Sequence, residues 1–408
     1  MDNPKTNKIF TILTFLGLYL FSTGVSFAVF DYLIKPPDLF GQNQVTTTED
    51  GEEEGQLLVD NSGPKTEVCP LNGQKYTKAE KGVWSERRPL AVMIENHQES
   101  RPQSGLSRAD VVYEAVAEGG ITRFMALFYC DAVARENIVG PVRSARTYFV
   151  DWASEYGETP IYVHVGGAHC EATTGEGCLN GAKADALGQI GDYGWEGEND
   201  FNQFSIGYPT FWRDYERLGH TVATEHTMYS TTERLWGVAK KRGWTNKDPD
   251  GVDWQTNFTS WSFYPDKEVE KLAKGGVNEV EFNFWDKYDD YRVKWQYADD
   301  KGVYQRFNGG QPHLDLNTQK QLEAKNIVIQ FMKESPANDG YAGNAHLLYG
   351  TIGEGKALIL QNGNVIEAKW VKDSRKQRTV YYVQGKEVKF IPGKIWIETV
   401  PVGTKVSY

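Results

Sequence analysis

The chain has 408 residues, of which 40% are hydrophobic and 24% are charged, which is enough chain for two or three compact domains. Its formal net charge of -11 argues against a general nucleic-acid-binding protein, because attraction to phosphate requires a basic surface. Four cysteines and seven histidines are too few for a disulfide-dense or metal-rich class of protein.

The N-terminal segment has the pattern of a membrane-spanning helix. Lys5 and Lys8 precede an uncharged run from Ile9 to Phe30, and the chain continues as apolar past Asp31. About 20 apolar residues span a bilayer, and positive charge stays on the cytoplasmic side. We therefore expect a signal-anchor transmembrane helix over residues 9–34.

A cleaved signal peptide is the alternative interpretation of the same segment. Ser26 and Ala28 would suit its small-residue cleavage site. The apolar run is longer than the core of a usual signal peptide, which has ~7–15 residues, and no cysteine directly follows it to carry a lipid. We expect an uncleaved anchor in the cell membrane, with residues 1–8 in the cytoplasm and the bulk of the chain outside.

Residues 35–68 are polar and acidic, and they are poor in apolar side chains. This composition predicts a disordered stalk, with order beginning near Cys69 or Trp84. We divide the rest of the chain into an N-terminal domain, residues 69–250, and a C-terminal domain, residues 251–408.

Residues 110–130 predict a β-hairpin. Two alternating stretches flank Gly119 and Gly120, a pair typical of a two-residue hairpin turn. The alternation places Glu114 and Glu118 on one face, among valines. A buried acid there requires a cationic partner.

The stretch GPVRSART contains two arginines that flank Ser144. It predicts a helix from Ala145 to about Tyr156 with Ser144 as its N-cap. PIYVHV, residues 160–165, predicts a strand that ends at Gly166 and Gly167.

Two further elements are predicted in this domain. PLAVMIEN, residues 89–96, has the continuous apolar pattern of a buried strand. Ser230-x-x-Glu233 is a capping box, which predicts a helix that continues through Lys241.

From about Trp254 the pattern changes to short alternating stretches separated by Gly, Asn and Asp. These stretches are VEFNF, RVKWQY, IVIQFM, LILQNG, VIEAKW and TVYYV. They predict a mostly antiparallel sheet. The expected fold is therefore α+β, with a mixed α/β layered domain followed by a mostly antiparallel β-rich domain and preceded by one membrane helix.

Charge is unevenly distributed along the chain. Residues 355–408 contain ten Lys and Arg against four Asp and Glu, a net charge of +6, so the preceding residues carry -11 - 6 = -17. A basic tail on an acidic body suits contact with anionic lipid or wall polymer. A solvated β-sheet surface is the simpler interpretation.

The four cysteines suit an oxidising compartment. They are Cys69, Cys130, Cys170 and Cys178. Four cysteines permit three pairings, which the sequence leaves open; one of them joins Cys69 to Cys130 and Cys170 to Cys178. His164 and His169 lie near Cys170 and Cys178 in the sequence, which suggests a zinc site. The spacing of these residues matches no standard zinc-binding pattern, so no metal or cofactor is predicted.

The sequence contains no familiar catalytic motif, so no catalytic residue is assigned. It lacks a G-x-S-x-G elbow, an H-E-x-x-H pair, a phosphate-binding Walker loop and a G-x-G-x-x-G after a strand.

An anion-binding cleft is the hypothesis that the arginines favour. Arg143 and Arg146 lie at a predicted helix N-terminus, where free N–H groups attract anions, and the planar arginine fork suits phosphate or carboxylate. The candidate residues are Arg143, Ser144, Arg146, Arg123, Arg101, His164, Gly166, Gly167 and His226.

A structural role is the alternative for the same residues. Glu114 or Glu118 would pair with these arginines and fix the hairpin against the helix, while Asn96 would bond loop backbone. The two interpretations differ in exposure, because a binding site requires at least one guanidinium open to solvent in a cleft.

Four motifs, in this order, resemble one family: RPQSGLSRADVVYE, EGGITRF, GPVRSAR and TEHTMYS. Together with NIVIQF, GEGKALILQNG, AKWVK and PGKIWIETVP they are similar to the YerB-like extracytoplasmic proteins, a pair of uncharacterised domains (DUF3048). The resemblance covers roughly Trp84 to Val402. It implies an envelope-attached protein, usually a lipoprotein, with no established enzymatic activity and no catalytic residues to carry over. Some family members are implicated with the wall-synthesis machinery, which implies partner binding. This chain departs from the family by having a membrane helix in place of a lipidated cysteine.

The expected function is that of a membrane-anchored binding or scaffold module in the cell envelope. Its partners would be the membrane and either a cell-wall polymer or a wall-synthesis protein, and not nucleic acid. The alternative is a hydrolase or transferase acting on wall polymer, with Glu118 or Glu225 as acid/base and His226 assisting. A purely structural protein is the third possibility.

Overall fold

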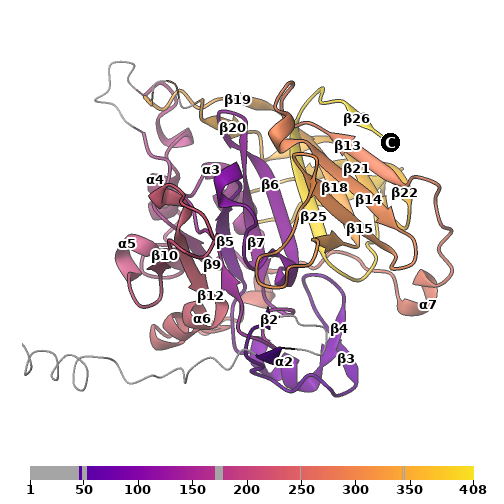
Figure 1. Cartoon of the computed structure of the whole chain (residues 1–408), viewed down its shortest axis with the longest axis horizontal. Coiled ribbons are helices and arrows are strands. Elements are labelled where there is room, and N and C mark those ends of the chain that lie inside the picture. The colour runs from indigo at the N-terminus through magenta and orange to yellow at the C-terminus, as the bar shows by residue number, and fades with distance from the viewer. Residues whose placement is uncertain (1–45, 48–52, 171–177, 249, 342, 344) are drawn as a thin grey trace, which may run out of the picture. The chain divides into compact units, whose positions relative to one another are not determined.

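An eleven-stranded mixed sheet is the central element of the structure (Figure 1). The protein is described from a computed structural model, over residues 46–47, 53–170, 178–248, 250–341, 343 and 345–408. The strands lie in the order β10-β9-β5-β7-β6-β25-β18-β21-β22-β23-β24. Their bounds are β5 Leu90–Glu95, β6 Val111–Glu118, β7 Ile121–Phe128, β9 Ile161–His164, β10 Asp200–Asn202, β18 Asn326–Met332, β21 Gly353–Gln361, β22 Asn364–Lys372, β23 Val380–Val383, β24 Lys386–Glu387 and β25 Ile395–Pro401.

Strand β25 joins the N-terminal and C-terminal halves of this sheet. It runs parallel to both neighbours, so that Trp396 pairs with Val112 of β6 and with Ile327 of β18. The C-terminal strands thus extend the sheet that the N-terminal strands begin, and Thr46–Tyr408 forms one compact unit. The predicted boundary at residue 250 therefore does not separate two independent sheets.

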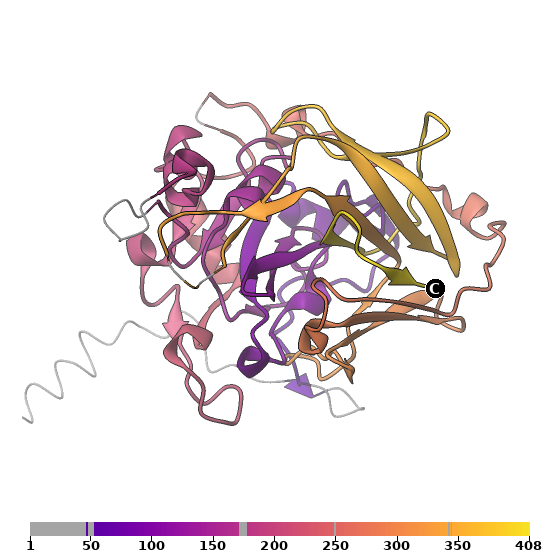
Figure 2. The same ribbon diagram turned by 90° about the horizontal axis from the view of Figure 1, so that it is seen from above.

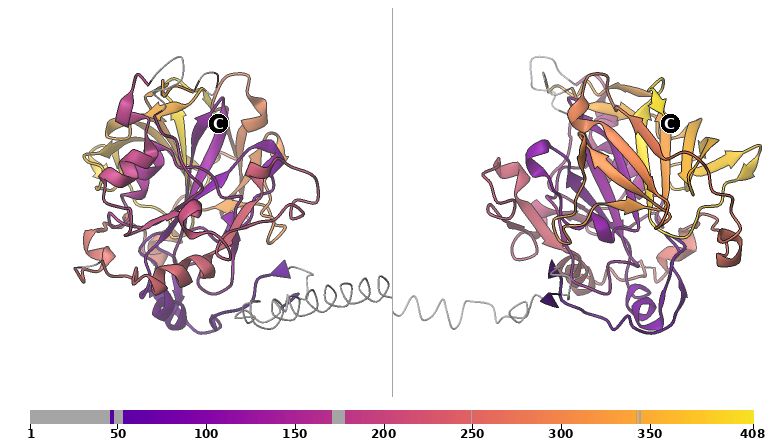
Figure 3. Two further views of the ribbon diagram at one scale, coloured as in Figure 1. Left: turned by 90° about the vertical axis from the view of Figure 1, so that its left-hand side faces the viewer. Right: turned by 45° about the vertical axis from the view of Figure 1, so that its right-hand side comes forward.

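A second, six-stranded sheet packs on one face of the first. Its order is β16-β15-β14-β13-β26, with β17 paired to β15. The bounds are β13 Glu279–Phe282, β14 Val293–Ala298, β15 Val303–Asn308, β16 Gln311–Pro312, β17 Glu323–Ala324 and β26 Val406–Ser407. Side chains of β14 alternate between buried and less buried, as expected for a sheet covered on one face. Trp295 of β14 meets Trp396 of β25 with ring centroids 5.3 Å apart, and the right view of Figure 3 shows the second sheet in front of the first.

Short helices cover the opposite face near the N-terminal strands. They are α3 Thr147–Ala153, α4 Ala186–Asp192, α5 Gln203–Ile206 and α6 Thr232–Lys241. Helix α2, Lys78–Trp84, lies beside the strands Lys65–Val68 and Lys75–Thr77, and α7, Asp266–Val269, lies near the C-terminal strands. Tyr113 of β6 stacks on Trp152 of α3 at 5.6 Å, which fixes α3 against the sheet. Figure 2 and the left view of Figure 3 show α3 to α6, in magenta and rose, on the side away from the yellow C-terminal strands.

Small pairings complete the described part of the chain. The remaining strands are β1 Thr46–Thr47, β2 Glu53–Glu54, β3 Lys65–Val68, β4 Lys75–Thr77, β8 Ile138–Val139, β11 Trp212–Arg213, β12 Met228–Thr231, β19 Glu334–Pro336 and β20 Leu347–Tyr349. Strand β12 lies between β11 and β8 and leads directly into α6.

The predicted strands are largely confirmed. β6 and β7 form the hairpin, with positive φ values of 54° at Gly119 and 82° at Gly120, a conformation that glycine adopts readily. The six C-terminal stretches are β13, β14, β18, β21, β22 and β23. The fold is mixed α/β with substantial antiparallel sheet and few helices.

The expectation that Glu114 and Glu118 share a face is wrong. The strand register shifts between Val116 and Glu118, which marks a β-bulge, and the extra residue reverses the alternation. Glu114 lies opposite Phe124, whereas Glu118 contacts Arg123, the neighbouring residue that points to the other face.

Helix α3 is shorter than predicted, and its N-cap is Arg146, not Ser144. The amide of Ala145 donates to the carbonyl of Gly166 at 3.0 Å, so this segment is extended and bridged to the loop after β9. The helix can therefore begin only at Thr147.

Helix α6 is confirmed, but its cap lies one residue later than predicted. The Thr231 side chain accepts from the Arg234 amide. The Ser230 hydroxyl instead donates to the Thr210 carbonyl at 2.9 Å, because Ser230 is already paired within β12.

The predicted anchor, residues 9–34, lies outside the described residues. Within the described residues no helix combines the length and the apolar character needed to cross a membrane. The predicted stalk, residues 35–68, contains paired segments in its described part. Thr46–Thr47 pairs with Glu53–Glu54, and Leu57 bridges to Arg135. Lys65–Val68 forms β3, because the antiparallel partner β4 satisfies its backbone groups.

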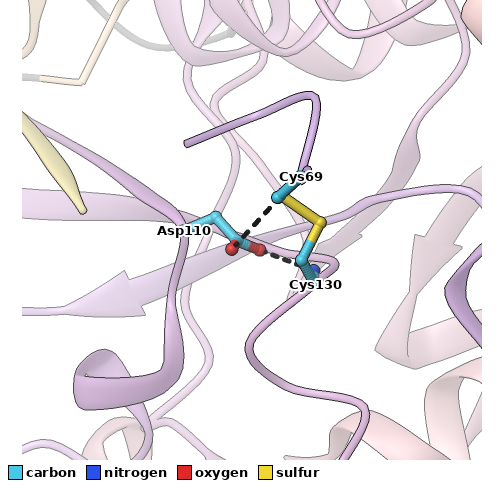
Figure 4. A group of neighbouring side chains, drawn as sticks. All are labelled: Cys69, Asp110 and Cys130. Carbon is cyan, nitrogen blue, oxygen red and sulfur yellow. Dashed lines mark hydrogen bonds between the residues drawn. A yellow bond between two sulfur atoms is a disulfide. The ribbon is translucent and has the colours of Figure 1, made fainter. Parts of the chain in front are cut away.

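Two disulfides are formed, in the pairing that the sequence analysis named. Cys69 is bonded to Cys130, which ties the start of the fold to the segment after β7, and Cys170 is bonded to Cys178. Asp110 lies beside the first bridge and accepts the Cys130 amide at 2.9 Å (Figure 4). The four sulfurs are thus not available as thiolate ligands for a metal.

Candidate functional site

A cleft of about 310 Å³ opens where the GPVRSART segment lies beside the loop after β9. Its polar lining residues are Arg143, Ser144, Gly166, Gly167, Arg213 and Glu225, and Phe204 forms an apolar wall. We call this space the Arg143 cleft. Four of the predicted anion-binding residues line it.

The two glycines allow the walls of the cleft to approach each other. A Cβ atom on Gly167 would lie 2.8 Å from Leu187 and 3.2 Å from Ala145, closer than ordinary contact. Gly166 has a positive φ of 57°, and a Cβ there would lie 3.3 Å from the Phe204 ring. The glycines therefore shape the cleft.

Arg143 keeps part of its guanidinium open to solvent. Its Nε forms an ion pair with Glu95 Oε2 at the end of β5, and its side chain is 25% exposed. Among the described residues, neither terminal nitrogen has a hydrogen-bond or ion-pair partner. Glu95 thus positions the base of the fork and leaves its outer edge facing the cleft.

Arg213 supplies a second positive charge, and Glu225 a negative one. Arg213 Nη1 donates to the carbonyl of Thr224 and, at 3.3 Å, to the hydroxyl of Thr227. The pKa of Glu225 is lowered, first by a hydrogen bond from its own backbone amide and then, against partial burial, by positive neighbours that include Arg143. The cleft therefore presents two guanidinium groups and one ionised carboxylate.

Arg123 and Arg146 have a structural role instead. Arg123 is fully buried; it donates to Glu118 at 3.2 Å and to the Ser144 carbonyl at 3.0 Å. Arg146 bonds the other oxygen of Glu118, and His346 Nε2 lies 3.3 Å from that oxygen. Burial alone would raise the pKa of Glu118, but Arg123, His346 and Arg146 together lower it strongly.

Glu114 belongs to a separate buried network between the two sheets. It pairs with Arg306 of β15, whose Nε lies 3.8 Å from Glu398 Oε1. Glu398 is directly opposite Glu114 on the parallel strand β25, and burial and then the Glu114 charge raise its pKa. Arg306 also donates to His313 Nδ1 at 3.0 Å.

Arg101 and Asn96 lie at the edge of this network, away from the Arg143 cleft. Arg101 donates to Asn96 Oδ1 at 3.1 Å and to the Asp290 carbonyl at 2.9 Å. Asn96 in turn donates to Glu114 at 3.2 Å and Thr122 at 2.7 Å. Asn96 therefore forms hydrogen bonds mainly with side chains, and not mainly with loop backbone as predicted.

The two candidate histidines are not among the residues that line the cleft. His164 is buried, with Nδ1 2.6 Å from the Gly166 carbonyl and Nε2 2.6 Å from Asp200. His226 is 5% exposed and stacks on His97 with ring centroids 4.7 Å apart. Burial lowers the pKa of His226, in opposition to the nearby carboxylate of Glu95.

Several residues that organise the site were missed by sequence reasoning. Glu95 ends the buried strand LAVMIE, and an acid after five apolar residues was a usable signal of a buried partner. Arg306 occupies a buried-face position in the alternating strand VYQRFN, which was a weaker signal. The sequence around Arg213 carried no signal of a role in the site.

Comparison with known proteins places the chain in a family. Its residues 73–245 match the model for "Protein of unknown function (DUF3048) N-terminal domain", and residues 280–397 match the corresponding C-terminal domain. "Putative lipoprotein YerB" of Bacillus subtilis (strain 168) is 33% identical over 342 residues, which are 82% of this chain and 86% of that protein. The crystal structure of YerB protein from Bacillus subtilis superposes with a TM-score of 0.64 at 27% identity, covering 84% of this chain and all of that chain. The chain belongs to the DUF3048, or YerB-like, family.

Proposed function

We propose that the protein is an envelope-attached binding module whose Arg143 cleft holds an anionic group of a cell-wall polymer. The observation that carries this proposal is the partly exposed side chain of Arg143, which lines a cleft together with Arg213 and the aromatic ring of Phe204. Arginine forks bind phosphate and carboxylate through paired hydrogen bonds. The 75%-exposed ring of Phe204 offers a face on which a sugar ring can pack.

The location outside the cytoplasm rests on three further observations. Two disulfides suit an oxidising compartment. The related protein of Bacillus subtilis is named a lipoprotein. The run from Ile9 to Phe30, preceded by Lys5 and Lys8, has the length and charge of a single-pass anchor in the cell membrane.

Binding is favoured over hydrolysis by the state of the predicted acid. A general acid must hold a proton near the working pH. Glu118 is kept ionised by Arg123, His346 and Arg146, so it is unsuited to donate one. The ionised Glu225 lines the cleft beside Arg143 and Arg213, whose positive charges favour binding of an anion there.

The test is co-sedimentation of the full-length chain, in mild detergent, with purified cell-wall sacculi. Arg143→Ala/Arg213→Ala is expected to weaken binding at least tenfold, since each charge-assisted hydrogen bond contributes about 1.5–3 kcal/mol. Arg292→Ala is the matched control and should bind as the wild type does, because Arg292 directly precedes β14, is 41% exposed and does not line the cleft. Glu225→Gln should tighten binding by removing a like charge.

Sacculi stripped of their acidic polymers distinguish the ligand. Loss of wild-type binding to stripped sacculi supports an anionic wall polymer. Retained binding by the double arginine variant would remove the cleft from the account. Wild-type binding that survives stripping would point to the neutral glycan or to a protein partner and contradict the proposal.

A further inference from the structure

Two histidines and a glutamate converge just beyond the end of β5 and do not belong to the lining of the Arg143 cleft. His97 and Glu99 belong to the turn that opens the 3₁₀ helix Gln98–Ser100, and His226 ends the 3₁₀ helix Thr224–His226. Of the three side chains, His226 lies 3.9 Å from Glu95, the carboxylate that pairs with Arg143.

The ligand atoms of this group lie close together. One nitrogen or oxygen from each of His97, Glu99 and His226 lies within 4.8 Å of the others. His226 Nε2 is 3.9 Å from Glu99 Oε2. The two imidazole rings are nearly parallel, at 10°. The Glu99 amide donates to His97 Nδ1 at 3.3 Å, which keeps both side chains on one turn.

Glu95 orients the His226 ring. Its Oε2 lies 3.9 Å from His226 Nδ1, a buried nitrogen without a hydrogen bond in the described part of the chain. Arg143 holds the same carboxylate oxygen. Nδ1 therefore lies on the Glu95 side of the ring, and Nε2 lies on the Glu99 side, where it is placed to bind a metal ion. A metal-binding imidazole usually donates its other N–H to a carboxylate, and Glu95 lies on that side of His226.

We propose that His97, Glu99 and His226 bind one divalent transition-metal ion, such as Zn²⁺, with Glu95 as the orienting residue. Two imidazoles and one carboxylate are a donor set suited to zinc, and with three protein ligands a fourth position stays open to solvent. The ligand atoms of the three side chains lie within 4.8 Å of one another, and the 3.9 Å between His226 Nε2 and Glu99 Oε2 is more than the roughly 3.3 Å between the ligand atoms of a tetrahedral zinc ion. His97 is half-buried and the Glu99 side chain is 53% exposed, so both can rotate inward toward the more fixed His226.

This inference goes beyond the proposed function, although the two sites share Glu95, which pairs with Arg143 and also lies beside His226. The metal ligands do not line the Arg143 cleft, and the arginine variants leave all three in place. Sacculus binding without zinc binding, or the reverse, would separate the two proposals.

The test is a calorimetric titration of the full-length chain with Zn²⁺ in mild detergent. The protein carries a tag without histidines and is first stripped with a chelator. One zinc ion is expected to bind per chain, and His97→Ala and Glu99→Gln should each weaken binding at least tenfold. His220→Ala is the matched control, because His220 is exposed and lies outside the group.

Cobalt(II) gives a second readout, since a four- or five-coordinate ion absorbs far more strongly in the visible range than an octahedral one. Strong bands in the wild type that disappear in His97→Ala support the site. Absence of saturable zinc binding by the wild type would overturn the proposal, as would binding unchanged in both ligand variants. His226→Ala adds a third variant; if it fails to fold, the two exposed-ligand variants still decide the result.

Discussion

Replacing Arg306 with methionine tests whether the buried ion network holds the two sheets together. Arg306 is fully buried, pairs with Glu114 and lies 3.8 Å from Glu398. Its guanidinium also lies over the Trp396 ring, 4.8 Å from the centroid. Methionine keeps an unbranched apolar side chain there but removes the cation, so that Glu114 loses its partner while it remains buried.

The expected loss of stability is large. Removing one partner of a buried ion pair costs about 3–5 kcal/mol, because the other charge is left without compensation. The compact unit spans 408 - 45 = 363 residues. At about 2.1 cal/mol/K per residue its unfolding entropy is about 0.76 kcal/mol/K, so Tm should fall by about 4–7 °C.

Thermal melting followed by circular dichroism measures this change in the full-length protein. Arg292→Met is the control, because its side chain is 41% exposed and its carboxylate partner lies 4.0 Å away. An exposed pair of this kind contributes about 0–1 kcal/mol. Arg306→Met/Glu114→Gln should melt above Arg306→Met, since the stranded charge is removed. Equal shifts for Arg306→Met and Arg292→Met would refute the reasoning.

Two further predictions concern local packing and pH. Gly157→Ala should lower the free energy of unfolding by about 1–3 kcal/mol more than Gly194→Ala does. A Cβ atom at Gly157 would lie 2.5 Å from the Trp254 carbonyl oxygen, whereas Gly194 has a similar φ but faces open space. Equal losses of unfolding free energy in urea would contradict this prediction. Burial, followed by the charge of Asp131, raises the pKa of Asp110 to about 7, so the folded state holds a proton that the unfolded state has lost between about pH 4 and pH 7. Stability from this group should therefore fall as pH rises through that range, by up to roughly 4 kcal/mol in total, and the fall should be absent in Asp110→Asn. Parallel stability–pH curves for wild type and Asp110→Asn would show that another group is responsible.

Local sequence rules predicted the hairpin well because its determinants are themselves local. Gly119 and Gly120 supply the positive φ values of the turn, and alternation defines the strands. The bulge before Glu118 has no such signature. One extra residue sent this acid to the Arg123 face and separated it from Glu114.

Long-range pairing explains the other differences. Ser144 looked like an N-cap, but a bridge from Ala145 to the loop after β9 keeps the segment extended. Arg306 meets Glu114 across 192 positions of sequence, and a single sequence carries no signal for such a contact. The part of the site that was predictable is therefore the Arg143 segment and its glycines. The sequence could not show which arginines pair with internal carboxylates and which line the cleft, because these contacts depend on the three-dimensional fold.

Photo-crosslinking from the wall of the Arg143 cleft tests the central claim most directly. A photoreactive phenylalanine analogue at position 204, whose native ring is 75% exposed, would report what occupies the cleft in intact cells. The same analogue at Tyr408, 58% exposed on the second sheet, is the control. We expect crosslinks to wall polymer from position 204 but not from position 408, and we expect them to be lost in Arg143→Ala/Arg213→Ala. Crosslinks of equal yield from both positions, or crosslinks that persist without the two arginines, would contradict it.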